Sequence, residues 1–315
     1  MRFLVVCLSV FFSLPVLADK YPPIGTSMTV RQVSEHAYYV QGEAGMATEN
    51  EGFISNAGFV VTSEGVVLFD ALGTPSLAWT LLQKIRDITD KPITHVIVSH
   101  YHADHIYGLQ VFKEEGAKII APTGAHTYLG SETAASLLED RMMSLEPWVN
   151  EQTQLVPPDQ IIDKALRFTS GELSFELNYL GSAHSDGDLT LFIPEEGVLF
   201  SGDIIFEGRV PFVGDADTKV WLAKLQELET DGLKVLVPGH GPHAQNPNQA
   251  VRMTREYVAH LRSVMGKAVE EMVDFETAFE EGDWSAYKAM PAYDAAHRRN
   301  AYQVYLAMEN EAILN

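Results

Sequence analysis

Cysteine is nearly absent from the sequence, which contains one, Cys7, among 315 residues. A single cysteine cannot form an internal disulfide bond, and it cannot build a structural zinc site from thiolates. If the chain is cleaved after Ala18, as the N-terminal segment indicates, the mature protein has no thiolate nucleophile either. Any metal site must then use His, Asp and Glu side chains, which survive an oxidising compartment such as a bacterial periplasm.

Basic residues are also scarce: the sequence contains 22 Lys and Arg and 43 Asp and Glu, which gives a formal net charge of -21. A surface this acidic repels phosphate backbones and anionic lipids, so we expect no nucleic-acid partner and no docking on such membranes. After the N-terminal segment no apolar run reaches the length of a membrane span. We therefore expect a soluble mature chain.

The first residues have the pattern of a secretory signal peptide. Arg2 supplies a basic start, residues 3–17 are apolar, and the stretch closes on the small residue Ala18. This apolar run is too short for a membrane span, and no stop-transfer charges follow it. We predict a signal peptide over residues 1–18 and a periplasmic or secreted protein.

Strand and helix patterns alternate through the following two hundred or so residues. Short apolar runs predict strands at 37–40, 58–61, 66–69, 93–98, 118–121, 173–180, 189–193, 198–200 and 234–237. Helical spacing predicts helices at 75–90, 124–146 and 218–231, the first beginning at an N-cap Thr74 followed by Pro75. From residue 248 onward strand runs vanish. We predict a mixed α/β domain over 19–245 and a C-terminal helical extension over 246–315.

Side chains that bind metals gather at the ends of several predicted strands. Four lie in the segment SHYHADHIYG, which follows strand 93–98, and each of the others follows or ends a strand beside a small residue. The candidate ligands are His100, His102, Asp104, His105, His184, Asp203 and His240. Strand ends on one side of a sheet converge on a crevice, where small residues let the backbone turn. In the alternative interpretation, the segment at 100–105 is only a polar loop and the other histidines are ordinary buried residues. That interpretation requires four separate segments to match the pattern by chance.

Seven nitrogen and oxygen ligands are too many for one tetrahedral zinc ion. They suit two metal ions about 3.5–4 Å apart that share a bridging oxygen. Imidazole and carboxylate ligands fit zinc, iron or manganese, and we expect two divalent ions, with zinc first. Asp203 is the carboxylate best placed to lie between the two ions.

The pattern over about residues 38–241 resembles the metallo-β-lactamase superfamily of hydrolases, because the His-x-His-x-Asp-His segment and the three later ligands occur in its order. The resemblance implies a four-layer αββα sandwich, and it places Asp70 behind a ligand histidine. It also implies which residues hold which ion. The first ion would take His100, His102 and His184, the second would take Asp104, His105 and His240, and Asp203 would touch both.

The resemblance implies an enzyme in which a metal-bridging hydroxide attacks a small-molecule substrate, with Asp104 as the catalytic residue that orients the nucleophile and passes a proton. Asp203 stands where β-lactamase branches generally carry Cys or Ser. It is more similar to thioesterase, lactonase, phosphodiesterase and sulfatase branches, and the layout resembles exported zinc hydrolases of quinoprotein and sulfur-oxidation systems. We expect cleavage of an ester, thioester, lactone or related bond. β-Lactamase activity and a mononuclear iron sulfur dioxygenase are the alternatives.

Other candidate residues are weaker. His95 lies inside an apolar strand and suits a core position, and His243 suits a loop. Asp188 fits a turn cap after His184. Tyr107 suits either a hydrogen bond to the substrate or packing, and residues 142–148 suit an apolar helical face rather than a lid.

Overall fold

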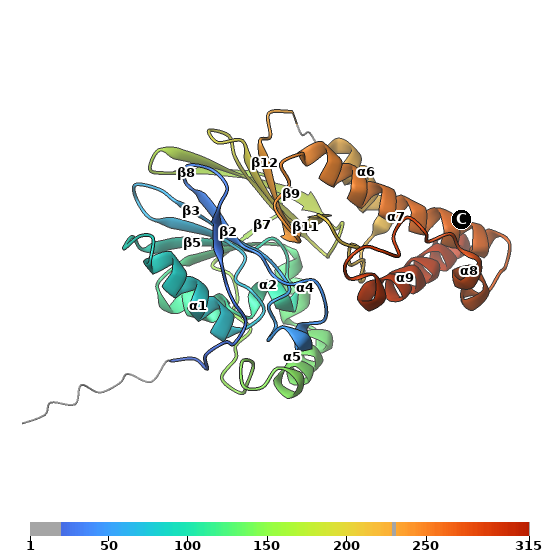
Figure 1. Ribbon diagram of the computed structural model, residues 1–315, viewed down its shortest axis with the longest axis horizontal. Helices are drawn as coiled ribbons and strands as arrows, with labels where there is room; N and C mark the ends of the chain where they lie inside the picture. Colours follow the sequence, from blue (N-terminus) through green and yellow to red (C-terminus); the bar gives the residue numbers. More distant parts are fainter. Residues whose placement is uncertain (1–19, 229–230, 315) are drawn as a thin grey trace, which may run out of the picture.

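The computed structural model describes residues 20–228 and 231–314, so the expected signal peptide lies outside the described residues. Two β-sheets form the centre of the molecule (Figure 1). The first sheet has seven strands in the order of the sequence. Its strands are β1 (Val30–Gln32), β2 (Ala37–Val40), β3 (Ala57–Val61), β4 (Val66–Phe69), β5 (Ile93–Ile97), β6 (Lys118–Pro122) and β7 (Gln160–Ile162).

The second sheet has five strands in the order β12-β11-β10-β9-β8. Its strands are β8 (Leu166–Ser170), β9 (Leu173–Gly181), β10 (Asp188–Ile193), β11 (Val198–Phe206) and β12 (Val235–His240). The first half of β9 alternates buried and half-buried residues, as its sequence predicts. β11 is buried along its whole length because helices cover one face and the first sheet covers the other.

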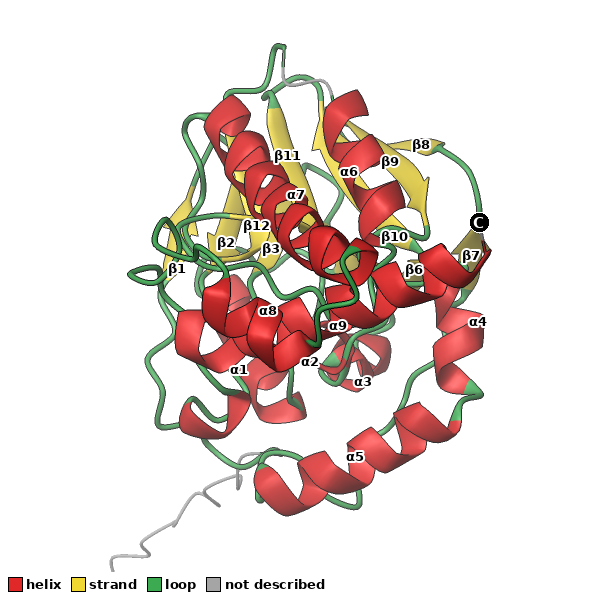
Figure 2. Ribbon diagram, turned by 90° about the vertical axis from the view of Figure 1, so that its right-hand side faces the viewer, coloured by secondary structure: helices red, strands yellow, loops and turns green. Residues whose placement is uncertain are grey.

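Helices cover the outer face of each sheet, which completes the expected αββα sandwich. The first sheet carries α1 (Pro75–Arg86), α2 (Ala103–Ile106), α3 (Leu109–Glu114), α4 (Gly124–Leu129) and α5 (Glu132–Ser144) on its side of the molecule. The second sheet lies under α6 (Thr218–Glu227) and α7 (Pro247–Glu270), as Figure 2 shows. A short 3₁₀ turn, Ala47–Glu49, precedes β3. The α/β fold class is therefore confirmed.

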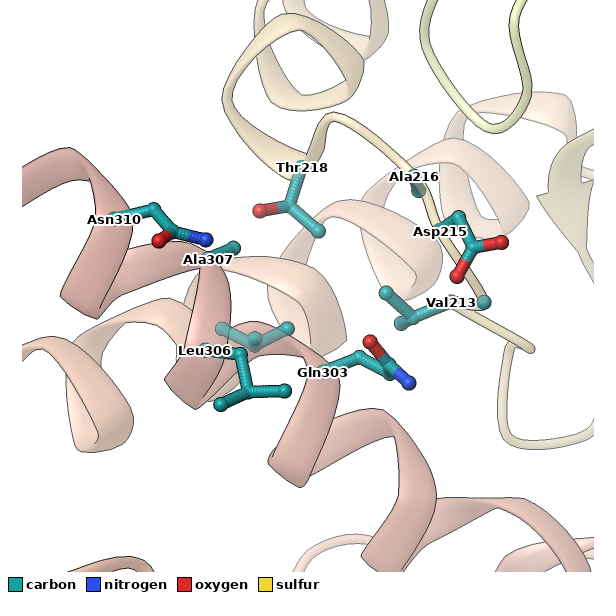
Figure 3. A pocket seen from close by; sticks show the side chains of 10 residues that line it. Val213, Asp215, Ala216, Thr218, Gln303, Leu306, Ala307 and Asn310 are labelled. Carbon is teal, nitrogen blue, oxygen red and sulfur yellow. The ribbon is translucent and has the colours of Figure 1, made fainter.

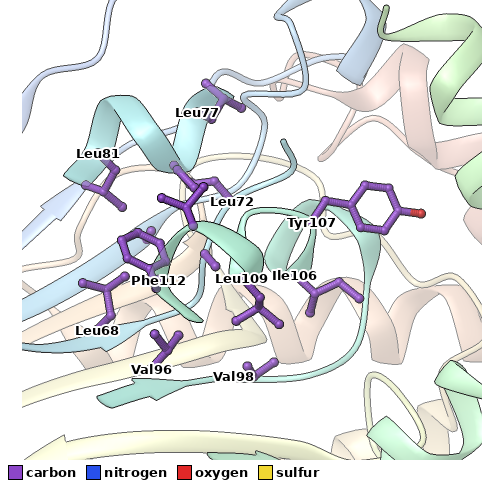
Figure 4. Close-up of a cluster of buried hydrophobic side chains, with 14 of the residues drawn as sticks. Leu68, Leu72, Leu77, Leu81, Val96, Val98, Ile106, Tyr107, Leu109 and Phe112 are labelled. Atoms are coloured by element: carbon purple, nitrogen blue, oxygen red, sulfur yellow. The ribbon is translucent and has the colours of Figure 1, made fainter. Parts of the chain in front are cut away.

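The apolar pattern of the sequence accounts for the first core. Thr74 caps α1 by accepting a hydrogen bond from the Leu77 amide at 3.1 Å, and Pro75 occupies the first turn. The helix then places Leu77 and Leu81 in one buried cluster with Leu68 and Phe112, and Figure 4 shows these side chains. All four side chains are fully buried. This packing holds the segment between β5 and β6, which carries four candidate ligands.

The helical extension predicted for the C-terminal region is present as a region of α-helices. It consists of α7 together with α8 (Phe275–Glu281) and α9 (Tyr293–Leu314), and α9 packs along α7. One sequence prediction is wrong in detail: residues 124–146 form two helices rather than one. They separate at Gly130, and the Ser131 hydroxyl caps α5 through the Ala134 amide at 3.0 Å. None of the described helices is long and apolar enough to cross a membrane.

Candidate metal centre

The structure brings all seven candidate ligands together at one end of the sandwich. Four follow β5 in the first sheet, on the loop into α2 and within that helix. The other three come from the second sheet, where His184 lies between β9 and β10, Asp203 lies within β11 and His240 ends β12. Both sheets therefore contribute to the same cluster, as the rule for strand ends predicts.

The first group of nitrogen atoms belongs to His100, His102 and His184. The Nε2 atom of His100 lies 2.9 Å from Nδ1 of His102, and Nε2 of His184 lies 3.2 Å from the same Nδ1. The spacing of two residues turns His100 and His102 toward each other, as expected for an extended segment. Three imidazole nitrogens thus face a common point.

The second group consists of Asp104, His105 and His240. Asp104 Oδ2 lies 3.2 Å from His240 Nε2 and 3.5 Å from His105 Nε2. Asp203 lies between the two groups, with Oδ2 3.4 Å from His184 Nε2 and 3.3 Å from His240 Nε2. Its Oδ1 lies 3.3 Å from His105 Nε2. The Asp203 carboxylate is therefore positioned to touch ions held by either group.

These separations match what metal coordination requires. Four ligands placed tetrahedrally at 2.0–2.1 Å from a zinc ion lie about 3.3 Å from one another. The distances between these ligand atoms run from 2.9 to 3.5 Å, a range that includes that value. Within the described chain, His105 Nε2 and Asp203 Oδ1 are buried and have no hydrogen-bond partner. Such atoms are costly unless a cation or another partner satisfies them, so the residues fit two divalent ions.

Neighbouring groups orient the ligands of the second group. Asp70 Oδ2 accepts from His105 Nδ1 at 2.9 Å and from the Ser99 hydroxyl at 2.8 Å, and its Oδ1 accepts from the Ser99 amide at 2.7 Å. His240 Nδ1 donates to the Ile54 carbonyl at 2.7 Å. Both contacts place a proton on Nδ1 and leave Nε2 with a free lone pair. Asp70 thus lies where the resemblance predicts it.

Two further side chains shape the loops that carry ligands. Asn56 Nδ2 donates to the carbonyls of Pro238 and Gly241 at 2.7 and 2.8 Å, which secures the turn around His240. Asp188 Oδ2 accepts from the amides of Ala183 and Ser185 at 3.1 and 3.0 Å. Asp188 therefore caps the turn that contains His184, as its place in the sequence predicts.

Burial and neighbouring charges shift the pKa values of the candidate ligand histidines in opposite directions. Burial lowers the pKa of His184 to about 3 and holds the pKa of His100 well below its usual value. Both imidazoles are therefore neutral, as a metal ligand must be. Burial opposes protonation of His105, but the carboxylates of Asp104 and Asp203 raise its pKa well above the usual value. Together, the Asp104 and Asp203 carboxylates make the centre of the cluster favourable for positive charge.

Arg209, which the sequence analysis missed, also lies beside the site. Its side chain is buried, and Nη1 lies 3.4 Å from His240 Nδ1. Within the described chain no carboxylate lies within 4.0 Å of its guanidinium. The only signal in the sequence is a lone arginine shortly after Asp203, at the end of a buried strand.

The remaining candidates fall outside the ligand cluster. The His95 ring packs on Phe168 at 5.1 Å, and His243 Nδ1 lies 3.1 Å from the Tyr39 hydroxyl. The Tyr107 ring is fully buried, in agreement with the packing alternative. Leu145 likewise packs into the first core. Trp221, which the sequence did not single out, is fully buried, and the centre of its ring lies 5.2 Å from that of His184.

Comparisons with known proteins point to one family. A sequence-family model described as "Metallo-beta-lactamase superfamily" matches residues 50–240. A metallo-beta-lactamase type 2 of Bacteroides fragilis is 21% identical over 276 residues, covering 86% of this chain and 98% of that protein. A linear primary-alkylsulfatase of a Pseudomonas strain is 26% identical over 234 residues, covering 63% of this chain and 44% of that protein.

Solved structures show the same fold. A stereoselective inverting sec-alkylsulfatase from Pseudomonas aligns with a TM-score of 0.69 at 19% identity, covering 91% of this chain and 52% of that chain. A metallo-beta-lactamase from Pontibacter korlensis aligns with a TM-score of 0.57 at 21% identity, covering 74% of this chain and 99% of that chain. The same fold therefore occurs in a metallo-beta-lactamase and in an alkylsulfatase.

Proposed function

Because the chain belongs to the metallo-beta-lactamase superfamily and is a metal-dependent hydrolase, we propose that it binds two divalent metal ions and hydrolyses an ester, thioester, lactone or related bond of a small molecule. One observation carries the dinuclear proposal. Asp203 lies within 3.4 Å of ligand nitrogens in both groups, so neither group is complete without it. A mononuclear iron site of two histidines and one aspartate would leave the second group without a purpose.

Each group would hold one ion, with His100, His102 and His184 on one side and Asp104, His105 and His240 on the other. When bound, two such ions polarise a substrate oxygen and lower the pKa of a water molecule to about 7. The chain supplies imidazole nitrogens, oriented by hydrogen bonds at Nδ1, and the buried Asp203 carboxylate between the two groups. Zinc is the metal we expect, and iron and manganese suit the same ligands.

The two aspartates have different exposures, which separates their roles. The Asp203 side chain is 3% exposed and the Asp104 side chain is 24% exposed. Asp203 is therefore confined to holding charge inside the site. Asp104 reaches the solvent side, where its carboxylate can orient the attacking water and pass its proton to the leaving atom.

The substrate follows less directly from the ligands. Relatives named as β-lactamases and as an alkylsulfatase share this family, so their bonds belong in any test alongside those proposed here. An aspartate at position 203, rather than Cys or Ser, favours the ester, thioester and lactone group over β-lactams. Cleavage at the N-terminal signal would place this activity in the periplasm or outside the cell.

Elemental analysis of protein expressed with its N-terminal segment, followed by a hydrolysis panel over those bond types, tests the proposal. We expect two metal ions per chain and turnover of at least one ester, thioester, lactone or sulfate ester. Asp104→Ala should lower turnover by about 100-fold or more, because a positioned proton-transfer group contributes that much. The matched control is Asp186→Asn, an exposed acid in the loop of His184. One metal per chain together with undiminished turnover in Asp104→Ala would refute the proposal.

A further inference from the structure

The loop that links β11 to α6, residues 207–217, contacts the second ligand group of the metal centre. Its Glu207 amide donates to the His240 carbonyl at 3.3 Å, and Arg209 Nη1 lies 3.4 Å from His240 Nδ1. Asp215 is exposed at the other end of the loop. The loop thus begins beside the second ligand group.

The C-terminal helices hold this loop through one buried amide. Asn300 of α9 is fully buried, and its Oδ1 accepts from the Val213 amide at 2.9 Å. Its Nδ2 donates to the Pro211 carbonyl at 2.7 Å. Nearby, the Val210 amide donates to the Pro291 carbonyl at 3.0 Å. Three hydrogen bonds therefore tie consecutive parts of the loop to the helical extension.

Packing continues along the same boundary. Figure 3 shows Val213 and Asp215 of the loop beside Gln303, Leu306 and Ala307 of α9, around a cavity of about 290 Å³. Val210 and Val213 also pack in one buried cluster with Val304 of α9, and the Arg299 guanidinium lies over the Phe212 ring. Asn300 adds directional hydrogen bonds to this packing.

The Asn300 side chain is itself held in one orientation. Its Nδ2 also donates to the Tyr257 hydroxyl at 2.8 Å, and that hydroxyl lies 3.0 Å from His297 Nδ1. Tyr257 belongs to α7, so the arrangement joins both long helices of the extension. An amide with two donor contacts and one acceptor contact uses most of its capacity, and burying it otherwise would be costly.

We propose that Asn300 is a positioning residue, and that through it the C-terminal helices fix loop 207–217 as the wall of the substrate site. The effect on substrate rests on the proposed hydrolase function, whereas the effect on the loop does not. No candidate ligand lies in the loop, and His240 keeps its hydrogen bond to the Ile54 carbonyl outside it, so loosening the loop should weaken substrate binding and leave the metal ions in place.

The test compares Asn300→Leu, which keeps the side-chain size and removes all three hydrogen bonds, with Tyr305→Phe. Tyr305 donates to the Val273 carbonyl at 3.0 Å within the extension, away from the loop, so its loss controls for general weakening of the helices. Limited trypsin digestion followed by mass spectrometry reports cleavage after Arg209, which burial protects in the parent chain. We expect cleavage there at least about tenfold faster in Asn300→Leu, the factor that one lost hydrogen bond supplies, and unchanged in Tyr305→Phe.

Kinetics on whichever substrate the hydrolysis panel identifies then separate the roles. We expect KM to rise about tenfold in Asn300→Leu, with kcat within about threefold and two metal ions retained. Asn300→Asp keeps the acceptor for Val213 and loses the donor to Pro211. Its KM should lie between those of the parent chain and Asn300→Leu, and it replaces the leucine variant if that variant does not fold. Loss of metal or of kcat at constant KM, or unchanged protection of Arg209, would overturn the proposal. If no substrate is turned over, the digestion result still decides whether the loop is clamped.

Discussion

Gly239 offers a sharp test of the metal centre because its missing side chain makes room for a ligand. A Cβ atom at position 239 would lie 1.9 Å from Asp203 Oδ1, 2.7 Å from the Gly202 carbonyl carbon and 2.9 Å from the Asp203 amide. Carbon and oxygen normally approach to about 3.3 Å, so the carboxylate would retreat by about 1.4 Å. Rotation of the Asp203 side chain cannot relieve the other two contacts, because they involve main-chain atoms of β11, which is paired with β12. The displacement far exceeds the tolerance of about 0.2 Å in metal–ligand distances.

Gly239→Ala should therefore lose metal. We expect fewer than two ions per chain after gel filtration, measured by elemental analysis, and a metal affinity at least about 100-fold lower, measured by chelator competition. Gly130→Ala is the matched control, since a Cβ there meets nothing closer than the His126 carbonyl at 3.8 Å. Retention of both ions at unchanged affinity in Gly239→Ala would show that Asp203 is not a ligand, whatever the activity.

Three other perturbations test the surrounding structure. Asp70→Ala removes the three contacts to Ser99 and His105, so metal affinity in chelator competition should fall about 10–100-fold, and an unchanged affinity would contradict the role of Asp70. Phe112→Ala, in the first core, should lower the free energy of unfolding in urea by about 3–5 kcal/mol, whereas Met143→Ala, at 77% exposure, should change it little. Burial lowers the pKa of His297 to about 4, so the unfolded state takes up a proton first as the pH falls, and stability drops between about pH 6.5 and 4 by up to ~3 kcal/mol. His297→Phe should flatten that part of the urea profile, and identical slopes would refute the assignment.

The ligand cluster was predictable from sequence because its signal is local and its geometry follows from the fold class. His100, His102 and His105 are spaced for one turn, and His184 and His240 mark strand ends that meet at one edge of a sandwich. Asp203 follows the predicted strand 198–200, but β11 runs on to Phe206, so the predicted strand was too short and Asp203 lies inside it. Residue type and position in the sequence were sufficient to identify these candidate ligands, without knowledge of the contacts between loops.

The supports of the cluster could not be predicted in this way. His240 is oriented by the Ile54 carbonyl, and any residue at position 54 would offer the same atom. Asn56 and Asn300 act through backbone groups nearly two hundred and nearly ninety positions away, so no spacing rule connects them to their partners. Gly130 likewise separated α4 from α5 although glycine in a helical pattern is often tolerated. Long-range contacts to main-chain atoms leave no mark in residue composition.

The division of ligands between the sheets makes the centre and the fold one cooperative structure. The first group takes His100 and His102 from the first sheet and His184 from the second, and the second group likewise takes His240 from the second sheet. Asn56 adds a link between the sheets at the turn that carries His240. Neither sheet alone can assemble a complete group, so an ion bound there would hold the two sheets together. Because ligands that bind only the folded state raise its stability, metal affinity in this chain should depend in part on how well the two sheets pack.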